Sequence, residues 1–281
     1  MIEAIKKRRS VRTYKNKMLL KDDQKKIHDV IDEVLTLKGP FGNQIKLFFY
    51  DKPYVGKEQS IQIGTYGFVK NAKSFIAGSV LNTFEGIVDY GYLFEILILK
   101  LTDLDLGTVW LGGTFNREDF GYLLDIGEVI PAITPVGYPA EKLSIRESIM
   151  RNRIKADQRK SYQSLFFDQN FDTPLDENHS IAEYLDLVRI GPSASNKQPW
   201  RIIVDGNKVH FYLERTPNYG LDMPFDVQAL DMGIAISHFE AGLIEDKKTY
   251  ALLVDSNHPE ARNREYVISC ECIKNQNFKQ E

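Results

Sequence analysis

The sequence predicts an α+β or mixed α/β protein that consists of two related halves. Along its 281 residues, segments with apolar residues at helical spacing alternate with short segments of strand character. The order of helix, turn and strand starts again after Asp168, and the length corresponds to about two domains. We therefore predict one half over residues 1–160 and a second over residues 161–281, intertwined and packed like the subunits of a twofold dimer.

In the first half, the spacing of apolar residues separates helices from strands. Ile2 and Ile5 share one helical face, the apolar residues of 27–35 recur at helical spacing, and Gly39-Pro40 ends that helix. We expect helices over residues 2–8, 27–35, 89–103 and 146–160, and strands over residues 45–50, 74–81 and 130–138.

In the second half, the clearest signal is a hairpin. Asp205-Gly206-Asn207 lies between two apolar runs, which is typical of a tight turn between antiparallel strands. We expect helices over residues 181–188 and 227–243, and strands over residues 200–204, 209–213, 250–254 and 266–272.

Short matches between the halves indicate a diverged duplication. Gly39-Pro40-Phe41-Gly42-Asn43 and Gly191-Pro192-Ser193-Ala194-Ser195-Asn196 each end a helix and lead into a strand. Asp89-Tyr90-Gly91 and Asp231-Met232-Gly233 each open an apolar helix. Chance similarity between two helix–turn–strand units is the alternative.

Composition excludes several classes of protein. Lys and Arg number 36 and Asp and Glu 39, so the net charge of −3 lacks the basic excess of a nucleic-acid binder. Two cysteines are too few for a disulfide scaffold and fit a reducing cytoplasm. No apolar stretch follows the basic N-terminus, and residues 90–106 carry four charges. We expect a cytoplasmic protein without nucleic-acid or membrane partners.

A basic cluster follows the first helix. In Arg8-Arg9-Ser10-Val11-Arg12, guanidinium groups and a hydroxyl close together suit a phosphate dianion. A solvated basic face, or a patch for polyanions, is the alternative interpretation.

Two further segments suit close contact with a ligand. Residues 191–200 combine small residues with neutral polar side chains, but they match neither a phosphate-binding P-loop nor a nucleophile elbow. An ordinary capping loop is the alternative. The glycines of residues 107–113 beside Trp110 indicate either a backbone close to a flat ligand or a tight turn under a buried indole.

Together these segments resemble the FMN-dependent nitroreductases. The resemblance rests on Arg-Arg-Ser-x-Arg-x-Tyr at residues 8–14, Leu-Gly-x-x-Trp-Leu-Gly-Gly at 106–113, Gly-Tyr-Pro at 137–139 and Pro-Ser-x-x-Asn-x-Gln-Pro-Trp at 192–200. It implies an α+β fold with antiparallel or mixed sheets flanked by helices.

The order of the motifs departs from that of the family. We call residues 8–12 the basic start, residues 107–113 the glycine turn and residues 192–200 the Pro-Ser loop. In an ordinary family subunit, the Pro-Ser loop lies between the basic start and the glycine turn. In this sequence, that place is taken by residues 39–43, which lack the serines. Family enzymes are homodimers with FMN at the interface. The resemblance therefore implies a fused single chain, a monomer that acts as a pseudo-dimer and binds one FMN.

The resemblance also implies roles for particular residues. Arg8, Ser10 and Arg12 would hold the FMN phosphate with a contribution from Arg9, and Arg159 would add a further cation; Lys142, Arg151 and Arg153 are alternatives to Arg159. The remaining cofactor-binding residues would be Thr65, Tyr66 and Gly67 on the pyrimidine side, Leu111, Gly112 and Gly113 near N5, and Pro192, Ser193, Ala194, Ser195 and Asn196 along the ring and ribityl chain.

The implied activity is electron transfer from NAD(P)H through FMN to a small flat acceptor of nitroaromatic or quinone type, in a ping-pong cycle. A flavin-binding protein without catalysis, for sensing or storage, is the alternative. We expect no catalytic acid–base side chain and no metal, since the five histidines lack i, i+4 pairs and Cys270-x-Cys272 stands alone. His238 is expected to be a buried, hydrogen-bonded residue, and Asp222 and Asp226 to lie in an exposed acidic loop.

Overall fold

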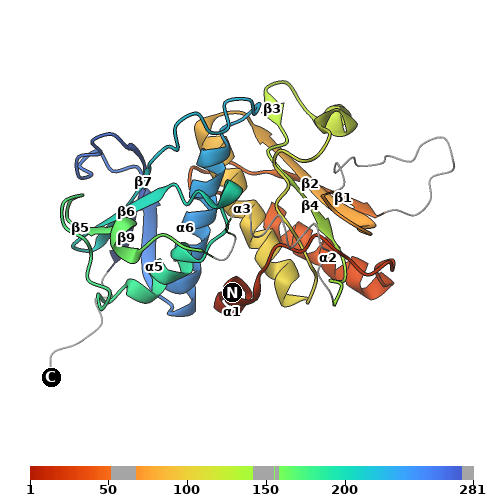
Figure 1. Ribbon diagram of the computed structural model, residues 1–281, viewed down its shortest axis with the longest axis horizontal. Coiled ribbons are helices and arrows are strands. Elements are labelled where there is room, and N and C mark those ends of the chain that lie inside the picture. Colours follow the sequence, from red (N-terminus) through yellow and green to blue (C-terminus); the bar gives the residue numbers. More distant parts are fainter. Residues whose placement is uncertain (52–67, 142–154, 156–157, 274–281) are drawn as a thin grey trace.

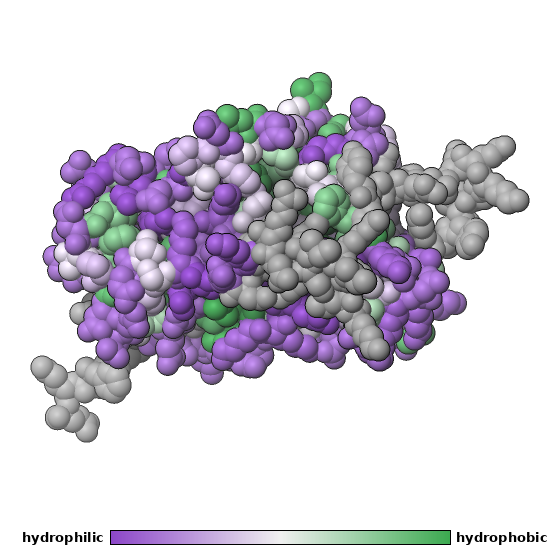
Figure 2. Space-filling model, viewed as in Figure 1, coloured by the Kyte–Doolittle hydropathy of each residue, from purple (hydrophilic) through white to green (hydrophobic). Residues whose placement is uncertain are grey.

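Two β-sheets lie at opposite ends of the molecule with a pair of long helices between them (Figure 1). The structure is a computed structural model, and it describes residues 1–51, 68–141, 155 and 158–273. The face shown in Figure 2 is mostly hydrophilic over these residues. Among the helices that the structure describes, none is both long enough and apolar enough to cross a membrane.

The first sheet is antiparallel and is built around β2 (Ser74–Leu81). β1 (Lys46–Asp51) pairs along one edge of β2, and β4 (Ile133–Val136) and β3 (Glu128–Val129) pair along the other. Seven of the eight β2 residues are buried, because helices cover one face of this strand and the segment that follows α3 covers the other.

The second sheet is mixed and has the order β5-β6-β7-β9-β8. β5 pairs parallel to β6, and all other neighbours are antiparallel. The strands are β5 (Phe166–Asp168), β6 (Trp200–Asp205), β7 (Lys208–Leu213), β8 (Thr249–Leu253) and β9 (Glu265–Ile273).

Helices α3 (Phe84–Asp103) and α6 (Val227–Glu245) pack against each other at the centre. Both are apolar on all sides, as expected for helices that are buried all round. At their crossing, a Cβ on Gly91 would lie 2.1 Å from the carbonyl oxygen of Leu230, and one on Gly233 would lie 2.0 Å from that of Val88. Glycine at both positions therefore lets the two backbones touch.

Shorter helices complete the core. α1 (Ile2–Lys7) packs against α3, α5 and α6, so the N-terminus contacts both halves of the chain. The other helices are α2 (Lys21–Leu35), α5 (Ala182–Arg189) and the 3₁₀ helices η1 (Arg117–Leu123), η2 (Tyr162–Ser164) and η3 (Ala194–Asn196). One hydrophobic cluster runs from Leu19 to Cys270 and joins both sheets through α3 and α6.

Most predicted elements are confirmed, with differences in their bounds. The helix expected over residues 27–35 begins at Lys21. The helix expected from Asp89 begins at Phe84, because Thr83 caps it by accepting a hydrogen bond from the N–H of Gly86 at 3.0 Å. Of the strand expected over 130–138, only Ile133–Val136 forms β4; β3 lies before the expected start, and Pro131 between the two strands has no N–H to donate. The short strand β5 was not predicted. The helix expected over 146–160 falls mostly outside the described residues.

Candidate functional site

A cavity of about 610 Å³ lies beside the first turns of α6 and is lined by residues from the N-terminal and the C-terminal parts of the chain. Its walls are the Ser10–Arg12 region, the turn at residues 110–114, the loop at residues 192–195 and the segment at residues 218–225. Ligand sites of small molecules typically measure about 300–1,000 Å³. The cavity therefore has the size of a cofactor or substrate site.

Ser10 is held at the cavity by a short strand-like pairing. Its neighbour Val11 donates an N–H to the carbonyl oxygen of Thr108 at 2.8 Å, and Ser10 and Thr108 form a parallel bridge. A Cβ on Gly107 would lie 2.9 Å from the side chain of Val11, so this close approach needs glycine. The basic start is thus fixed directly beside the glycine turn.

The glycine turn is fixed from behind by Arg117. Its guanidinium group donates to the carbonyl oxygens of Gly112, of Pro131 at 3.1 Å and of Ile130 at 3.3 Å. Burial lowers the pKa of Arg117. Because a trans peptide directs its C=O and N–H to opposite sides, the Gly113 N–H points away from Arg117. Arg117 therefore sets the direction of a backbone donor at the cavity wall.

The polar groups of the loop of residues 192–198 form hydrogen bonds both within the loop and with its surroundings. Ser193 Oγ accepts from the N–H of Gln198 at 2.9 Å, and Tyr219 donates its hydroxyl to Ser195 Oγ at 2.9 Å. Ser195, Asn196 and Gln198 have φ of 47°, 56° and 49°, a region that non-glycine residues rarely adopt. Strain of this kind is typical of loops that position a ligand.

The floor of the cavity is the first part of α6. Leu230 and Ile234 present apolar surface, and Asp231 Oδ1 accepts a hydrogen bond from the N–H of Ala194 at 2.9 Å. Asp231 is fully buried, and burial raises its pKa well above the ordinary value. A buried carboxyl therefore ties the loop to the helix.

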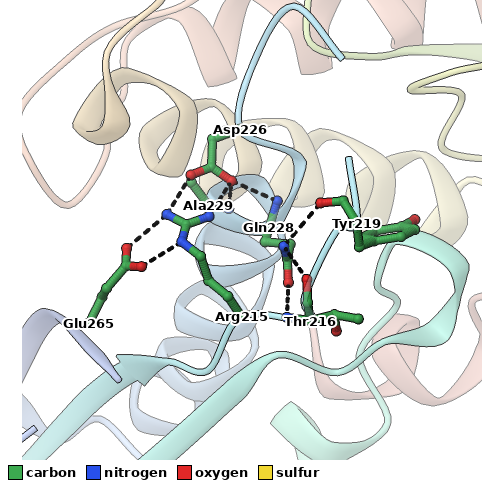
Figure 3. A network of polar contacts seen from close by, with 7 residues as sticks. All are labelled: Arg215, Thr216, Tyr219, Asp226, Gln228, Ala229 and Glu265. Atoms are coloured by element: carbon green, nitrogen blue, oxygen red, sulfur yellow. Dashed lines mark hydrogen bonds and ion pairs between the residues drawn. The ribbon is translucent and has the colours of Figure 1, made fainter. Parts of the chain in front are cut away.

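A polar network holds the segment of residues 218–225 over the cavity (Figure 3). Asp226 caps α6 by accepting from the N–H groups of Gln228 and Ala229, each at 3.0 Å, and it pairs with Arg215, which also pairs with Glu265. The Gln228 side chain accepts from the N–H of Thr216 at 2.7 Å and donates to the carbonyl oxygen of Tyr219 at 3.3 Å. The network fixes both ends of the segment.

A buried charged cluster lies behind the cavity wall. Glu95, fully buried on α3, forms a hydrogen bond with His238 Nε2 at 2.9 Å and accepts from Trp110 Nε1 at 2.7 Å, and Arg8 Nε lies 3.8 Å from the same carboxyl group. His238 Nδ1 lies 2.8 Å from the carbonyl oxygen of Leu187, so the prediction of a buried, hydrogen-bonded His238 is confirmed. The cluster joins the N-terminus, α3, the glycine turn and α6.

Comparison with known proteins assigns the chain to a family. A protein-family model described as "Putative TM nitroreductase" matches residues 1–243. The chain belongs to this nitroreductase family.

One solved structure with a TM-score above 0.5 shares the fold of this nitroreductase-family chain, and others resemble part of it. A "putative nitroreductase" from Thermotoga maritima has a TM-score of 0.59 at 18% identity, covering 96% of this chain and 92% of its own. A nitroreductase family protein from Clostridium novyi has a TM-score of 0.39 at 19% identity, covering 50% and 88%. A "Putative NADH Oxidase" from Clostridium acetobutylicum has a TM-score of 0.39 at 22% identity, covering 50% and 89%. A search of the curated proteins finds no match.

The cavity of this nitroreductase-family chain collects most of the predicted cofactor residues. Ser10 and Ser193, far apart in sequence, line the same cleft. The predicted residues that line the cavity are Ser10, Arg12, Leu111, Gly112, Gly113, Pro192, Ser193, Ala194 and Ser195. Their roles toward a cofactor stay predictions.

The other predicted residues lie elsewhere. Arg8 is placed against Glu95, and Arg9 is exposed and does not line the cavity. Arg159 and Asn196 line a neighbouring hollow of about 470 Å³, where Arg159 donates to the carbonyl oxygen of Ile190 at 3.1 Å. Thr65, Tyr66 and Gly67 lie outside the described residues, as do Lys142, Arg151 and Arg153.

Sequence reasoning missed one wall and the floor of the cavity. Tyr219, Met223 and Phe225 line it, and so does Asp231. Asp222 is exposed at the cavity, as expected for an acidic loop, whereas Asp226 is only partly exposed, because it caps α6 and pairs with Arg215. The turn residues Pro217-Asn218-Tyr219-Gly220 ahead of an apolar helix were the available signal.

Proposed function

We propose that this protein is an FMN-dependent oxidoreductase that passes electrons from NAD(P)H to a small flat acceptor of nitroaromatic or quinone type. The observation that carries the proposal is the meeting of Ser10 and Arg12, the glycine turn and the Pro192–Ser195 loop around one cavity in a nitroreductase-family chain. These are the segments through which the sequence resembles FMN enzymes.

The lining of the cavity fits FMN. Trp110, Leu111, Phe225 and Ile234 present apolar surface suited to a flat aromatic ring. Ser10 and Arg12 supply donors suited to a phosphate group at one wall. Ser193 to Ser195 provide small residues for the ribityl chain and the ring between these regions.

When bound, FMN supplies the two-electron chemistry, and the residues of the chain bind, orient and shield it. Arg117 fixes the peptide between Gly112 and Gly113, so the Gly113 N–H is a preset donor for the flavin edge near N5. No acid–base side chain is required for transfer of a hydride between stacked rings. One open cavity suits a ping-pong cycle, since donor and acceptor can occupy it in turn.

We also propose that the chain is a duplicated, single-chain pseudo-dimer with one FMN. Gly91 and Gly233 occupy matching places at the crossing of α3 and α6, which supports a pseudo-twofold relation. In the first half, residues 39–43 bind tightly to Asp89, whose carboxylate accepts from the N–H groups of Phe41 and Asn43, each at 2.8 Å. A loop closed in this way supports a single working site. As part of the same proposal, we place the protein in the cytoplasm as a monomer.

The phosphate assignment rests on Ser10 and Arg12. Arg8 faces Glu95, so we assign it to the buried cluster rather than to the phosphate. Arg159 stays a candidate from the neighbouring hollow, which shares Ser195 with the cavity.

Absorbance and melting temperature test cofactor binding. We expect freshly purified protein to be yellow, or to rise in Tm when FMN is added. Arg12→Ala should lower the affinity for FMN and leave the affinity for riboflavin, which lacks the phosphate, nearly unchanged. Lys6→Ala, a substitution at an exposed position of α1, should change neither affinity. A colourless protein whose Tm ignores FMN contradicts the proposal.

Anaerobic mixing with NADH or NADPH tests catalysis. We expect the visible flavin absorbance to bleach and to return when a quinone or nitroaromatic is added. A flavin that stays oxidised with both nucleotides would instead support flavin binding without turnover.

A further inference from the structure

Asp231 has a carboxyl oxygen that the protein itself does not satisfy. The residue is fully buried and lines the floor of the cavity. Its Oδ1 accepts from the N–H of Ala194 at 2.9 Å. Its Oδ2 has no hydrogen-bond partner among the described residues. Buried polar atoms are nearly always paired, so this exception, in a residue that lines the cavity, needs an explanation.

Asp89 shows what a satisfied carboxyl looks like at the matching place on α3. Its Oδ1 accepts from the N–H of Phe41 at 2.8 Å. Its Oδ2 accepts from the N–H and the side-chain amide of Asn43, at 2.8 and 2.9 Å. Both oxygens are therefore used by the loop that precedes β1.

The loop beside Asp231 directs its N–H groups elsewhere. The N–H of Asn196 donates to the carbonyl oxygen of Ser193 at 3.0 Å, and that of Lys197 donates to the carbonyl oxygen of Ala194 at 3.1 Å. The N–H of Gln198 donates to Ser193 Oγ. Only the Ala194 N–H reaches Asp231, and the strained turn at Ser195 and Asn196 keeps the loop in this arrangement.

We propose that Asp231 Oδ2 is a ligand contact, which forms a hydrogen bond with a neutral polar group of the flavin in the cavity. This inference rests on the proposed function and adds a binding residue to it. The matching groups are a ribityl hydroxyl, or a carbonyl oxygen or ring nitrogen of the isoalloxazine.

The environment agrees with a carboxyl that donates. Burial, with a smaller contribution from nearby Asp226, raises the pKa of Asp231. A protonated carboxyl offers one O–H donor, and each flavin group named above accepts hydrogen bonds.

Two substitutions at Asp231 test this contact. Asp231→Asn keeps an oxygen for the Ala194 N–H and places an amide donor at the Oδ2 position. Asp231→Leu removes both functions at similar volume. Asp89→Asn is the matched control, because it disturbs the satisfied carboxyl outside the cavity.

The measurements are the Tm without flavin and the dissociation constants for FMN, riboflavin and lumiflavin, by fluorescence titration. Asp231→Asn should have a Tm at or above that of the wild type and bind FMN within about threefold of it. Asp231→Leu should lose about tenfold in FMN affinity, the size of one buried hydrogen bond. Asp89→Asn should lower the Tm and leave the affinity of the folded protein within about threefold.

The three flavins locate the contact. A loss for FMN and riboflavin but not for lumiflavin assigns it to a ribityl hydroxyl, and an equal loss for all three assigns it to the ring. Wild-type affinity of Asp231→Leu for all three flavins overturns the inference. A wild-type protein that binds none of them refutes the proposed function and this inference with it.

Discussion

The crossing of α3 and α6 leaves no room for a side chain at Gly233, so Gly233→Ala is a direct test of the packing. The added Cβ would lie 2.0 Å from the carbonyl oxygen of Val88 and 2.5 Å from the backbone nitrogen of Tyr92. These are main-chain atoms of a buried helix, so no change of rotamer can relieve the contact. The helices must separate, and α6 carries the floor of the cavity.

The magnitude follows from two opposing effects. Overpacking a buried site costs about 1–3 kcal/mol, and a clash with backbone belongs at the top of that range. Alanine is a better helix former than glycine by about 1 kcal/mol, which offsets part of the loss. We expect a net loss of about 2 kcal/mol in the free energy of unfolding, or about 4–8 °C in Tm for a chain of this size.

Urea denaturation with a flavin titration measures both consequences. Gly233→Ala should lower the urea midpoint and weaken flavin binding, because Leu230 and Asp231 move with α6. Gly121→Ala is the control, since its Cβ would have no heavy atom within 4 Å. If Gly233→Ala unfolds at the same urea concentration as Gly121→Ala, the helices are not in the contact described.

Four further changes test other parts of the structure. Glu95→Gln should lower stability by about 3 kcal/mol, because it leaves Arg8 and His238 without their buried carboxylate; an unchanged urea midpoint would contradict this. Arg117→Met should cost about 2 kcal/mol, because buried carbonyl oxygens lose their donor, and weaken flavin binding; calorimetry and titration check the two parts. Asp226→Ala should cost about 1–2 kcal/mol through the lost helix cap, whereas Asp226→Asn should recover about half of that in the same melting assay. Burial, and to a smaller extent repulsion by Arg201, lowers the pKa of Lys160 from 10.5 to about 8. The folded state therefore loses this proton at a lower pH than the unfolded state, so the free energy of unfolding should rise as the pH increases from about 8 to 10.5. Lys160→Met should remove that gain, and an unchanged slope of Tm against pH would refute the assignment.

Local sequence signals predicted much of the fold. β2 was predicted with its observed bounds, because Ser74–Leu81 is a compact run of strand-forming residues. The β6–β7 hairpin was predicted from its turn, and Gly206 has the positive φ of 60° that such a turn needs. The three-residue strand β5 was missed, because it is too short to show a pattern and owes its strand geometry to pairing with β6 and with the segment around Pro174.

The parts of the site that lie in recognisable motifs were predicted, and the contacts that depend on the packing of distant segments were missed. Ser10, Gly112 and Ser193 were identified from residue types and spacing, and all line the cavity. The partner of Arg8 could not be predicted, because Glu95 meets it only through the packing of α1 against α3 and α6. The open oxygen of Asp231 depends on hydrogen bonds inside a distant loop, which leave no periodic pattern in the sequence.

The central place of α3 also has a consequence during translation. The ribosome releases α3 long before α6, although nearly every side chain of α3 is buried in the finished protein. Until α6 emerges, the apolar surface of α3 in the nascent chain lacks the helix that buries it in the folded protein. Such exposed apolar surface favours aggregation and recruits chaperones. A ligand that needs the whole cavity cannot stabilise that state, because Ser10 is synthesised long before Ile234 and both line the cavity.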